Sequence, residues 1–264
     1  SVSAPTYDPN KFDPGISTSD WQMLSNHPRN PLINKTISGQ YPPGSTFKMM
    51  VGLAALETGV ITSKTKSFCP GYIEIGDMKF HCWHKHGHGS VDLQDAIAQS
   101  CDVFFYEIAL KTGINNIAKI SREFGLGFPT GINLPGEKSG LIPDRKWKLD
   151  IKKQVWRPGE TIIAGIGQGY VLATPIQLAL MSARIANGGR KIKPTLLKTP
   201  ILQTASFSSV KVSEENLNII KKAMEKVSLD EFGTGRNFRL GIKGVEMAGK
   251  TGTVQVRRIS TKER

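Results

Sequence analysis

A long apolar run that follows a Pro-Gly turn predicts a buried helix. Residues 46–59 read TFKMMVGLAALETG and are apolar on every side except at Lys48 and Glu57. A helix that is apolar all round is buried, and glycine is common just after a helix ends, as Gly59 would be here. Lys48 is therefore expected on an element of the core, where burial disfavours the charged ammonium and favours a neutral, basic amine.

Similar patterns predict elements further along the chain. Residues 92–99 are expected to form a helix, which Ser100-Cys101-Asp102 separates from a second helix that begins Phe-Phe-Tyr. Residues 245–256 have the composition of a strand, in which Gly252 would let a substrate backbone approach closely. We further expect an irregular loop at residues 138–160, strand and loop at 191–212, an amphipathic helix at 214–227 and a mobile loop at 230–240.

The first candidate for chemistry is the pair Ser45 and Lys48, which form an SxxK motif. Residues at i and i+3 of a helix lie on one face about one turn apart, so the lysine amine can reach the serine hydroxyl. A serine hydroxyl needs an adjacent base to act as a nucleophile, and at a helix start it also gains from the positive end of the helix dipole. On its own, the pair is better explained as a helix cap and a lysine that extends to solvent, because such short patterns are common by chance.

Two further motifs favour the catalytic interpretation. Ser100 and Asp102 place short polar side chains at a junction where apolar packing would otherwise be expected. Lys250-Thr251-Gly252 lies in the strand-like segment near the end of the chain. Each triplet is weak on its own, but the order SxxK, SxD and KTG makes chance a poor explanation.

The three motifs resemble those of the penicillin-recognising serine transferases and hydrolases. Over essentially its whole length the chain is similar to class B penicillin-binding proteins, in particular to the subgroup that acts in cell elongation. The segments that carry this resemblance are PTYDPNKF at residues 5–12, NPLINKTISGQYPPGSTFKM at 30–49, GIGQGYVLATPIQLA at 165–179 and EMAGKTGTVQVRR at 246–258. The resemblance implies an α/β fold of the penicillin-binding protein and β-lactamase type. In it, an antiparallel central sheet is flanked by helices, and an all-helical subdomain carries SxxK and SxD.

The resemblance implies a peptidoglycan D,D-transpeptidase that works through an acyl-enzyme. Ser45 would attack the carbonyl of the penultimate D-alanine of a stem peptide and expel the terminal D-alanine. Lys48 would take the serine proton, and Ser100 would relay it to the leaving amine. The amine of a neighbouring stem peptide would then capture the acyl group as a cross-link, and β-lactam antibiotics would trap the same serine. Asparagine is commoner than Asp102 at this catalytic position in the wider superfamily, which leaves the charge there open.

The third motif would bind the substrate, according to the same resemblance. Lys250 would supply positive charge, Thr251 and Thr253 would bind the terminal carboxylate, and Gly252 would belong to the same substrate-binding segment. The backbone amides of Ser45 and Thr253 would form an oxyanion hole, in which each donor typically contributes roughly 3 to 4 kcal/mol. This chemistry requires no cofactor.

The net charge and hydropathy of the chain limit the classes of binding partner that can be expected. The 264-residue chain has 35 Lys and Arg against 22 Asp and Glu, which gives a net charge of +13. Such a balance suggests nucleic acid or an anionic surface. The sequence has no zinc-finger spacing, RNA-binding aromatic box or helix-turn-helix pattern, so a membrane surface or cell-wall polymer is favoured over nucleic acid. The sequence contains no run of about 18 apolar residues, which is the length needed to span a bilayer, and no signal peptide is present.

The resemblance implies that residues 1–264 form one transpeptidase domain, and we interpret the chain as a fragment of a longer protein. A membrane anchor, a non-catalytic pedestal domain and the last strands and helix of the domain would lie outside it. The anchor would hold the protein in the inner membrane, with the catalytic domain in the periplasm. The expected partners are elongation-complex membrane proteins, including a glycan polymerase.

Cysteines around a histidine-rich turn form a candidate metal site. Cys69, Cys82, His88 and Cys101 offer three thiolates and one imidazole, a tetrahedral set typical of structural zinc. The short CxxC spacing that makes a zinc prediction strong is missing. Members of the elongation subgroup hold zinc at corresponding positions, and a metal here would fix the second motif to the preceding loop.

Other arrangements of these residues remain open at this stage. His84 and His86 are alternative imidazole ligands. A Cys69–Cys82 disulfide, with Cys101 buried and free, would suit an oxidising compartment. The three cysteines could also be reduced core residues.

Two other functions share the three motifs. A serine β-lactamase would also hydrolyse the acyl-enzyme and needs a second base to activate water. The chain has no convincing ExxLN-like segment, and RPGETIIAGIGQGY matches the transpeptidase pattern instead. A non-catalytic β-lactam sensor would share the long-lived acyl-enzyme and would be attached to a signalling segment outside these residues. The segments at residues 5–12 and 30–49 favour a transpeptidase over a sensor.

Overall fold

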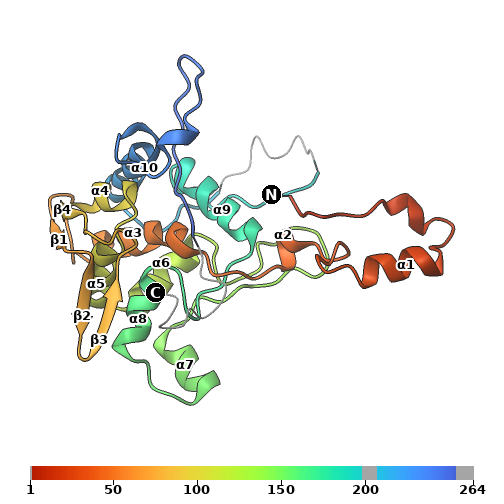
Figure 1. Cartoon of the computed structure of the whole chain (residues 1–264), viewed down its shortest axis with the longest axis horizontal. Helices are drawn as coiled ribbons and strands as arrows, with labels where there is room; N and C mark the ends of the chain where they lie inside the picture. The colour runs from red at the N-terminus through yellow and green to blue at the C-terminus, as the bar shows by residue number, and fades with distance from the viewer. Residues whose placement is uncertain (1, 198–206, 254–264) are drawn as a thin grey trace.

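The computed structural model describes residues 2–197 and 207–253. Helices dominate these ranges (Figure 1). The α-helices are α1 Thr18–Ser25, α2 Lys35–Ser38, α3 Lys48–Glu57, α4 Leu93–Ala98, α5 Asp102–Thr112, α6 Ile114–Glu123, α7 Arg145–Lys152, α8 Pro158–Gly165, α9 Pro175–Ala186 and α10 Glu214–Leu229. Short 3-10 helices are η1 Pro9–Phe12, η2 Gly44–Phe47 and η4 Arg236–Phe238, and the strands are β1 Ser67–Cys69, β2 Tyr72–Ile75, β3 Met78–His81 and β4 Gly89–Val91.

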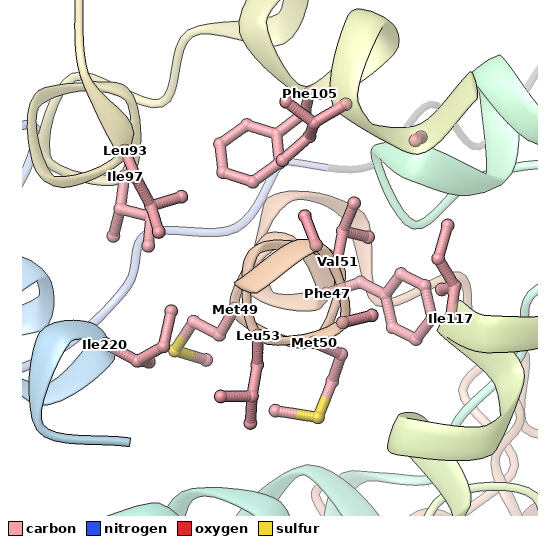
Figure 2. Close-up of a cluster of buried hydrophobic side chains, with 14 of the residues drawn as sticks. Phe47, Met49, Met50, Val51, Leu53, Leu93, Ile97, Phe105, Ile117 and Ile220 are labelled. Carbon is pink, nitrogen blue, oxygen red and sulfur yellow. The ribbon is translucent and has the colours of Figure 1, made fainter. Parts of the chain in front are cut away.

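Helix α3 lies at the centre of the core, as its apolar sequence predicts. All of its residues from Lys48 to Leu56 are buried. Figure 2 shows its side chains pointing outward all round, toward residues of four other helices. These neighbours are Leu93 and Ile97 of α4, Phe105 of α5, Ile117 of α6 and Ile220 of α10. A helix surrounded in this way is held in place by its neighbours rather than by its own propensity.

The predicted helices at 92–99 and after Asp102 are confirmed as α4 and α5, and the amphipathic helix at 214–227 is confirmed as α10. Helix α4 begins where the Asp92 side chain accepts a hydrogen bond from the Asp95 amide at 3.0 Å. Between α4 and α5, Ser100 adopts a left-handed backbone conformation, with φ 56°. This residue turns the chain so that two buried helices meet at the second motif.

The irregular loop expected at residues 138–160 is wrong in part, because it contains α7 and the start of α8. Asp144 caps α7 by accepting a hydrogen bond from the Trp147 amide at 2.7 Å, and Pro158 occupies the first turn of α8. An aspartate before a helix and a proline in its first turn are both start signals. The prolines and tryptophans of this segment suggested a loop although they flank short helices.

The strands form two separate antiparallel pairs, β1 with β4 and β2 with β3. Within the described residues there is no larger central sheet, which differs from the expected arrangement. The strand predicted at 245–256 is likewise not formed as far as residue 253, and its last residues lie outside the described ranges. A strand requires a hydrogen-bonded neighbour along its edge. Residues 249–253 have none among the strands that the structure describes.

The N-terminal segment with α1 extends away from the helical body (Figure 1). The expected mobile loop at 230–240 contains the short helix η4. The segment at 191–212 has one isolated bridge, between Arg190 and Ser209, and its residues 198–206 lie outside the described ranges. None of the described helices is long and apolar enough to cross a membrane.

Candidate active site

Lys48 joins the first two motifs through its hydrogen bonds. Its amine donates to the Ser100 carbonyl at 2.9 Å, to the Ser100 hydroxyl at 3.2 Å and to Asp102 Oδ1 at 2.6 Å. The lysine side chain is fully buried. An ammonium has three N–H donors, and all of them are used here. The contact with Asp102 is an ion pair, in which the carboxylate lies beside the lysine amine.

Asp102 is held from both sides of its carboxylate. While Oδ1 accepts from Lys48, Oδ2 accepts from the Trp83 amide at 2.9 Å. The Asp102 amide in turn donates to the sulfur of Cys82 at 3.3 Å. The acidic residue also lies in the first turn of α5, where a helix favours negative charge. These contacts fix Asp102 to the loop after β3.

Ser45 lies in the 3-10 turn η2, just before α3, and not in the α-helix itself. The amide of Gly44 donates to the carbonyl of Gly167 at 2.9 Å, which ties this turn to the GIGQGY segment. The Ser45 hydroxyl has no hydrogen-bond partner among the described residues, since the donors of Lys48 end on Ser100 and Asp102. Within the described residues, no hydrogen bond joins the Ser45 hydroxyl to the Lys48 amine.

The KTG segment lies beside the turn that carries Ser45. A methyl group added at Gly252 would lie 3.1 Å from the Thr46 methyl and 3.7 Å from the Pro43 carbonyl. Thr251 shares a hydrogen bond of 2.7 Å with the hydroxyl of Thr234. The Gly249 amide donates to the carbonyl of Met224 on α10 at 3.1 Å. The tertiary structure thus brings the three motifs to one place.

Lys250 is the second lysine of the site, and its surroundings differ from those of Lys48. It is half-buried, and its amine donates to the carbonyl of the adjacent Thr251 at 3.2 Å. Burial, together with the nearby charge of Lys48, lowers the pKa of Lys250 to about 7, although Asp102 acts in the opposite direction. Thr253, the last residue described, is exposed.

The predicted metal residues meet next to the second motif. One ligand atom from each of Cys69, Cys82, His88 and Cys101 lies within 4.8 Å of the others. His88 Nδ1 is 3.6 Å from the sulfur of Cys69 and 3.5 Å from that of Cys82. A tetrahedral zinc, with Zn–S near 2.3 Å and Zn–N near 2.05 Å, would separate such atoms by about 3.6 Å. The residues present therefore fit a zinc ion.

The alternatives for these residues are narrowed by the same contacts. All three cysteines are free thiols, so the Cys69–Cys82 disulfide is not formed. His84 Nδ1 lies 2.7 Å from the carbonyl oxygen of Gly87, and His84 is not part of the group of ligand atoms. His86 is exposed. His88 is thus the imidazole of the group, and its other nitrogen, Nε2, is buried without a partner among the described residues.

The pKa values of two of the thiols, Cys82 and Cys101, are shifted in opposite directions. A hydrogen bond from Cys101, with further ones from His88 and the His84 and Asp102 amides, lowers the pKa of Cys82 to about 3 against the effect of burial. The same contact with Cys82, together with burial, raises the pKa of Cys101. Three cysteine sulfurs and an imidazole are the kind of donor set that binds zinc.

Two residues of the site were not predicted from the sequence. Trp83 donates its ring N–H to the Ser100 carbonyl at 3.0 Å, and its backbone amide holds Asp102. Thr234 donates its amide to the carbonyl of Ala98 at 3.0 Å and links α4 to Thr251. Trp83 could have been suspected because it lies within the candidate metal turn. Thr234 lies in a glycine-rich segment that gave no signal.

The chain is similar to several known proteins along most of its length. The model of the penicillin binding protein transpeptidase domain matches residues 1–263. The peptidoglycan D,D-transpeptidase MrdA of Acinetobacter baumannii is 37% identical over 271 residues, which cover 100% of this chain and 40% of that protein. MrdA of Escherichia coli K12 is 37% identical over 265 residues, which cover 97% of this chain and 42% of that protein. The chain thus spans about two fifths of these relatives.

Solved structures show the same fold. The PBP2 of Pseudomonas aeruginosa, crystallised in complex with WCK 5153, has a TM-score of 0.89 and 41% identity, covering 97% of this chain and 60% of that one. The PBP2 of Helicobacter pylori has a TM-score of 0.90 and 40% identity, covering 96% of this chain and 48% of that one. The resemblance inferred from the motifs and the expected fold class are confirmed. The chain belongs to the penicillin binding protein transpeptidase domain family.

Proposed function

We propose that the domain is a serine-type peptidoglycan D,D-transpeptidase of cell elongation. The observation that carries this proposal is the position of Lys48, the buried lysine of SxxK, which donates hydrogen bonds to Ser100 and Asp102. Ser45 lies one turn before this lysine, and its hydroxyl has no hydrogen-bond partner among the described residues. The names of the relatives and the position of the KTG segment support it. One transpeptidase domain over residues 1–264 is part of the proposal.

In the proposed reaction, Ser45 Oγ forms a bond to the carbonyl carbon of the penultimate D-alanine, and the C–N bond to the terminal D-alanine breaks. Lys48 accepts the serine proton in its amine form, and Ser100 passes it to the leaving amine. Since Lys48 is paired in the resting site, it first gives up a proton, and Asp102 Oδ1 at 2.6 Å is the contacting group that can hold it. A second stem peptide then attacks the acyl-enzyme through its amine and releases Ser45.

The binding roles rest on the third motif. Thr251, Gly252 and Thr253 hold the terminal carboxylate, and Lys250 adds positive charge to the extent that it is protonated. The amides of Ser45 and Thr253 stabilise the oxyanion that develops on the attacked carbonyl. The Ser45 amide is well placed for this role because it lies at the start of the η2 and α3 helical run.

Intact-protein mass spectrometry with benzylpenicillin tests the proposal. We expect a stable adduct of one penicillin on the wild-type chain and no adduct on Ser45→Ala. Ser182→Ala, an exposed serine on α9, is the matched control and keeps the adduct. A wild-type chain that stays unlabelled overturns the proposal. Rapid turnover of a chromogenic β-lactam would instead indicate a serine β-lactamase.

A structural zinc ion at Cys69, Cys82, His88 and Cys101 is the second part of the proposal. Zinc supplies folding energy at such closed sites and takes no part in the acyl transfer. The sulfur of Cys82 accepts a hydrogen bond from the Asp102 amide, and the amide of the next residue, Trp83, donates to the Asp102 carboxylate. A metal bound to Cys82 would therefore fix Asp102, the acidic residue of the second motif.

Elemental analysis of the purified chain tests the zinc proposal. About one zinc per chain is expected for the wild type and for His86→Ala, an exposed histidine of the same turn. His88→Ala is expected to lose the metal and to melt at a lower temperature. Wild-type protein that carries no stoichiometric zinc, and whose melting temperature is unchanged by a chelator, contradicts the site.

The partners are proposed from the relatives. One structure similar to this chain is the complex between PBP2 and MreC of Helicobacter pylori, and another is a peptidoglycan synthase complex in which polymerization and crosslinking are coordinated. We accordingly place the domain on the periplasmic side of the inner membrane, with stem peptides as substrates, β-lactams as inhibitors, and elongation-complex membrane proteins and a glycan polymerase as partners. Co-purification with such a polymerase, which a sensor domain would not show, tests this assignment.

A further inference from the structure

The segment that contains α7 and leads into α8, residues 145–157, has an inverted pattern of burial. Lys148 is only 2% exposed. Leu149, Ile151 and Val155, in contrast, are 56%, 65% and 71% exposed. Charged side chains usually lie at the surface, and neighbouring apolar side chains that stay exposed mark interaction sites. Figure 1 shows α7 at the lower edge of the helical body, where this segment can meet a partner.

The inward positions of the segment are already occupied. The Lys148 amine forms an ion pair with Glu160 of α8 and lies 5.9 Å from the ring centroids of Trp156 and Tyr170. Trp147 packs edge-on against Tyr170, and the ring N–H of Trp156 donates to a hydroxyl on α8 at 2.7 Å. Breaking a buried ion pair is strongly destabilising. The exposed aliphatic side chains therefore cannot replace this network in the interior.

The exposed charges of the same segment are almost all positive. Its one acidic residue, Asp150, pairs with Lys146 at 2.6 Å. The remaining exposed cations have no ion-pair partner among the described residues, and they are Arg145, Lys152, Lys153 and Arg157. Aliphatic groups among unpaired cations are typical of a surface that binds an anionic bilayer, because the cations meet lipid head groups while the aliphatic groups enter the boundary with the acyl chains.

The composition of the segment favours a bilayer over other anionic partners. The rings that could stack on the sugars of a glycan, Trp147 and Trp156, are half-buried against Tyr170 and α8, and the exposed apolar groups are aliphatic. The centre of a protein interface is usually depleted in lysine, whereas Lys152 and Lys153 lie directly between the exposed aliphatic residues in the sequence.

We propose that residues 145–157 form a docking surface for an anionic lipid bilayer. Leu149, Ile151 and Val155 enter the head-group boundary, and Lys152 and Lys153 pair with lipid phosphates. This contact is separate from the acyl transfer proposed above and adds a membrane-binding site on the domain itself.

Co-sedimentation of the chain with lipid vesicles tests the docking surface. The two kinds of vesicle are phosphatidylcholine alone and phosphatidylcholine with a minor share of phosphatidylglycerol. The wild type is expected to bind the anionic vesicles at least about tenfold more tightly, because each basic residue near an anionic surface contributes about fivefold. High salt should reduce this ratio. Free glycerol phosphate should not compete, because it offers no acyl boundary to the aliphatic side chains.

Paired variants locate the binding on this segment. Lys152→Gln combined with Lys153→Gln should weaken binding to the anionic vesicles about tenfold. The matched control, Lys64→Gln combined with Lys66→Gln, removes the same charge from exposed positions before β1 and should change binding by about twofold or less.

A second pair of substitutions tests the aliphatic contribution. Ile151→Ser combined with Val155→Ser should also weaken vesicle binding about tenfold. The melting temperature should stay unchanged, because both side chains are already exposed in the folded chain. Binding equal to that of the wild type would overturn the inference.

Other outcomes would also overturn the inference. Equal losses for the two lysine pairs would trace the binding to net charge alone, and wild-type protein that ignores anionic vesicles would show that there is no such surface. A dimer in size-exclusion chromatography that Ile151→Ser with Val155→Ser abolishes, without vesicle binding, would assign the face to a second copy of the chain. Penicillin labelling of Ser45, measured in parallel, keeps a failure of the proposed function distinct from a failure of this surface.

Discussion

The helical region around α3 and the KTG segment each contain one lysine of the site, but the two lysines have different surroundings. Lys48 is fully buried and donates to Ser100 and to Asp102 at 2.6 to 3.2 Å. Lys250 is half-buried and donates only to its neighbour Thr251 among the described residues. The first lysine is compensated by a carboxylate, whereas burial and the charge of the first lysine lower the pKa of the second to about 7.

This difference shows that the rigid part of the site lies around α3, whereas the lysine whose charge can change with pH lies in the KTG segment. The residues that would move protons are fixed by a core that forms on all sides of α3. The segment that would hold the substrate is linked to this core by a few hydrogen bonds, from Gly249 to Met224 and from Thr251 to Thr234. A change in the first region should therefore alter stability strongly, and a change in the second should alter mainly binding and pH dependence.

The largest effect is expected for Lys48→Met. It leaves Asp102 as a buried carboxylate without its partner, and we expect a loss of about 3 to 5 kcal/mol in the free energy of unfolding. The penicillin adduct should also disappear. Urea unfolding and mass spectrometry measure the two effects. The comparison fails if Lys250→Met destabilises the chain by as much as Lys48→Met does.

Gly167→Ala is expected to have the next largest effect. Gly167 has φ 70°, and a methyl group there would lie 2.2 Å from the carbonyl oxygen of Gly44, so the turn that carries Ser45 would have to move. We expect a loss of about 2 to 4 kcal/mol and slower acylation by penicillin. Gly188→Ala is the matched control, since its φ is 79° but no atom lies within 4 Å of the added methyl group. Equal losses for both variants would show that backbone strain alone, and not the contact with Gly44, is responsible.

The pH dependence of stability should report on Lys250. Its pKa is about 7 in the folded state, against an ordinary lysine value of 10.5, so the folded state binds fewer protons than the unfolded state between these values. The unfolding free energy contributed by this group therefore rises as pH increases through that window. Relative to Lys250→Met, the wild type should gain about 2.5 kcal/mol between pH 6.5 and 9. Urea unfolding at both pH values measures the gain, and a constant difference between the two proteins would contradict the lowered pKa.

Gly252→Ala should affect stability least. Its added methyl group would meet the end of the Thr46 side chain at 3.1 Å, a contact that a small side-chain movement can relieve. We expect a change of about 0.5 kcal/mol or less in the unfolding free energy, but a clear slowing of acylation because a substrate backbone can approach less closely. Gly249→Ala, where no atom lies within 4 Å of the new methyl group, should acylate faster than Gly252→Ala. The reverse order would place the close approach elsewhere.

Much of the fold could be predicted where one pattern was strong and local. The apolar sequence after Ser45 required a buried helix, and the cap at Asp92 marked the start of α4. Helix α7 was missed because its start signal, Asp144, lies within a segment whose prolines and tryptophans suggested a loop. The expected strand at the KTG segment was not found as far as residue 253, because strand formation depends on neighbours that no local pattern specifies.

The sequence by itself determined the family, the three motifs and the set of residues that could bind zinc, because each depends on residue type and order. Only the tertiary structure decided which atoms these residues contact through hydrogen bonds or as members of the candidate metal group. It directed the Lys48 amine to Ser100 and Asp102 rather than to Ser45, and it selected His88 among the histidines of one turn. The physical reason is that charge and hydrogen bonding in a buried site depend on atoms that are far apart in sequence, such as those of Lys48 and Asp102, and their positions are set by the packing of helices around α3.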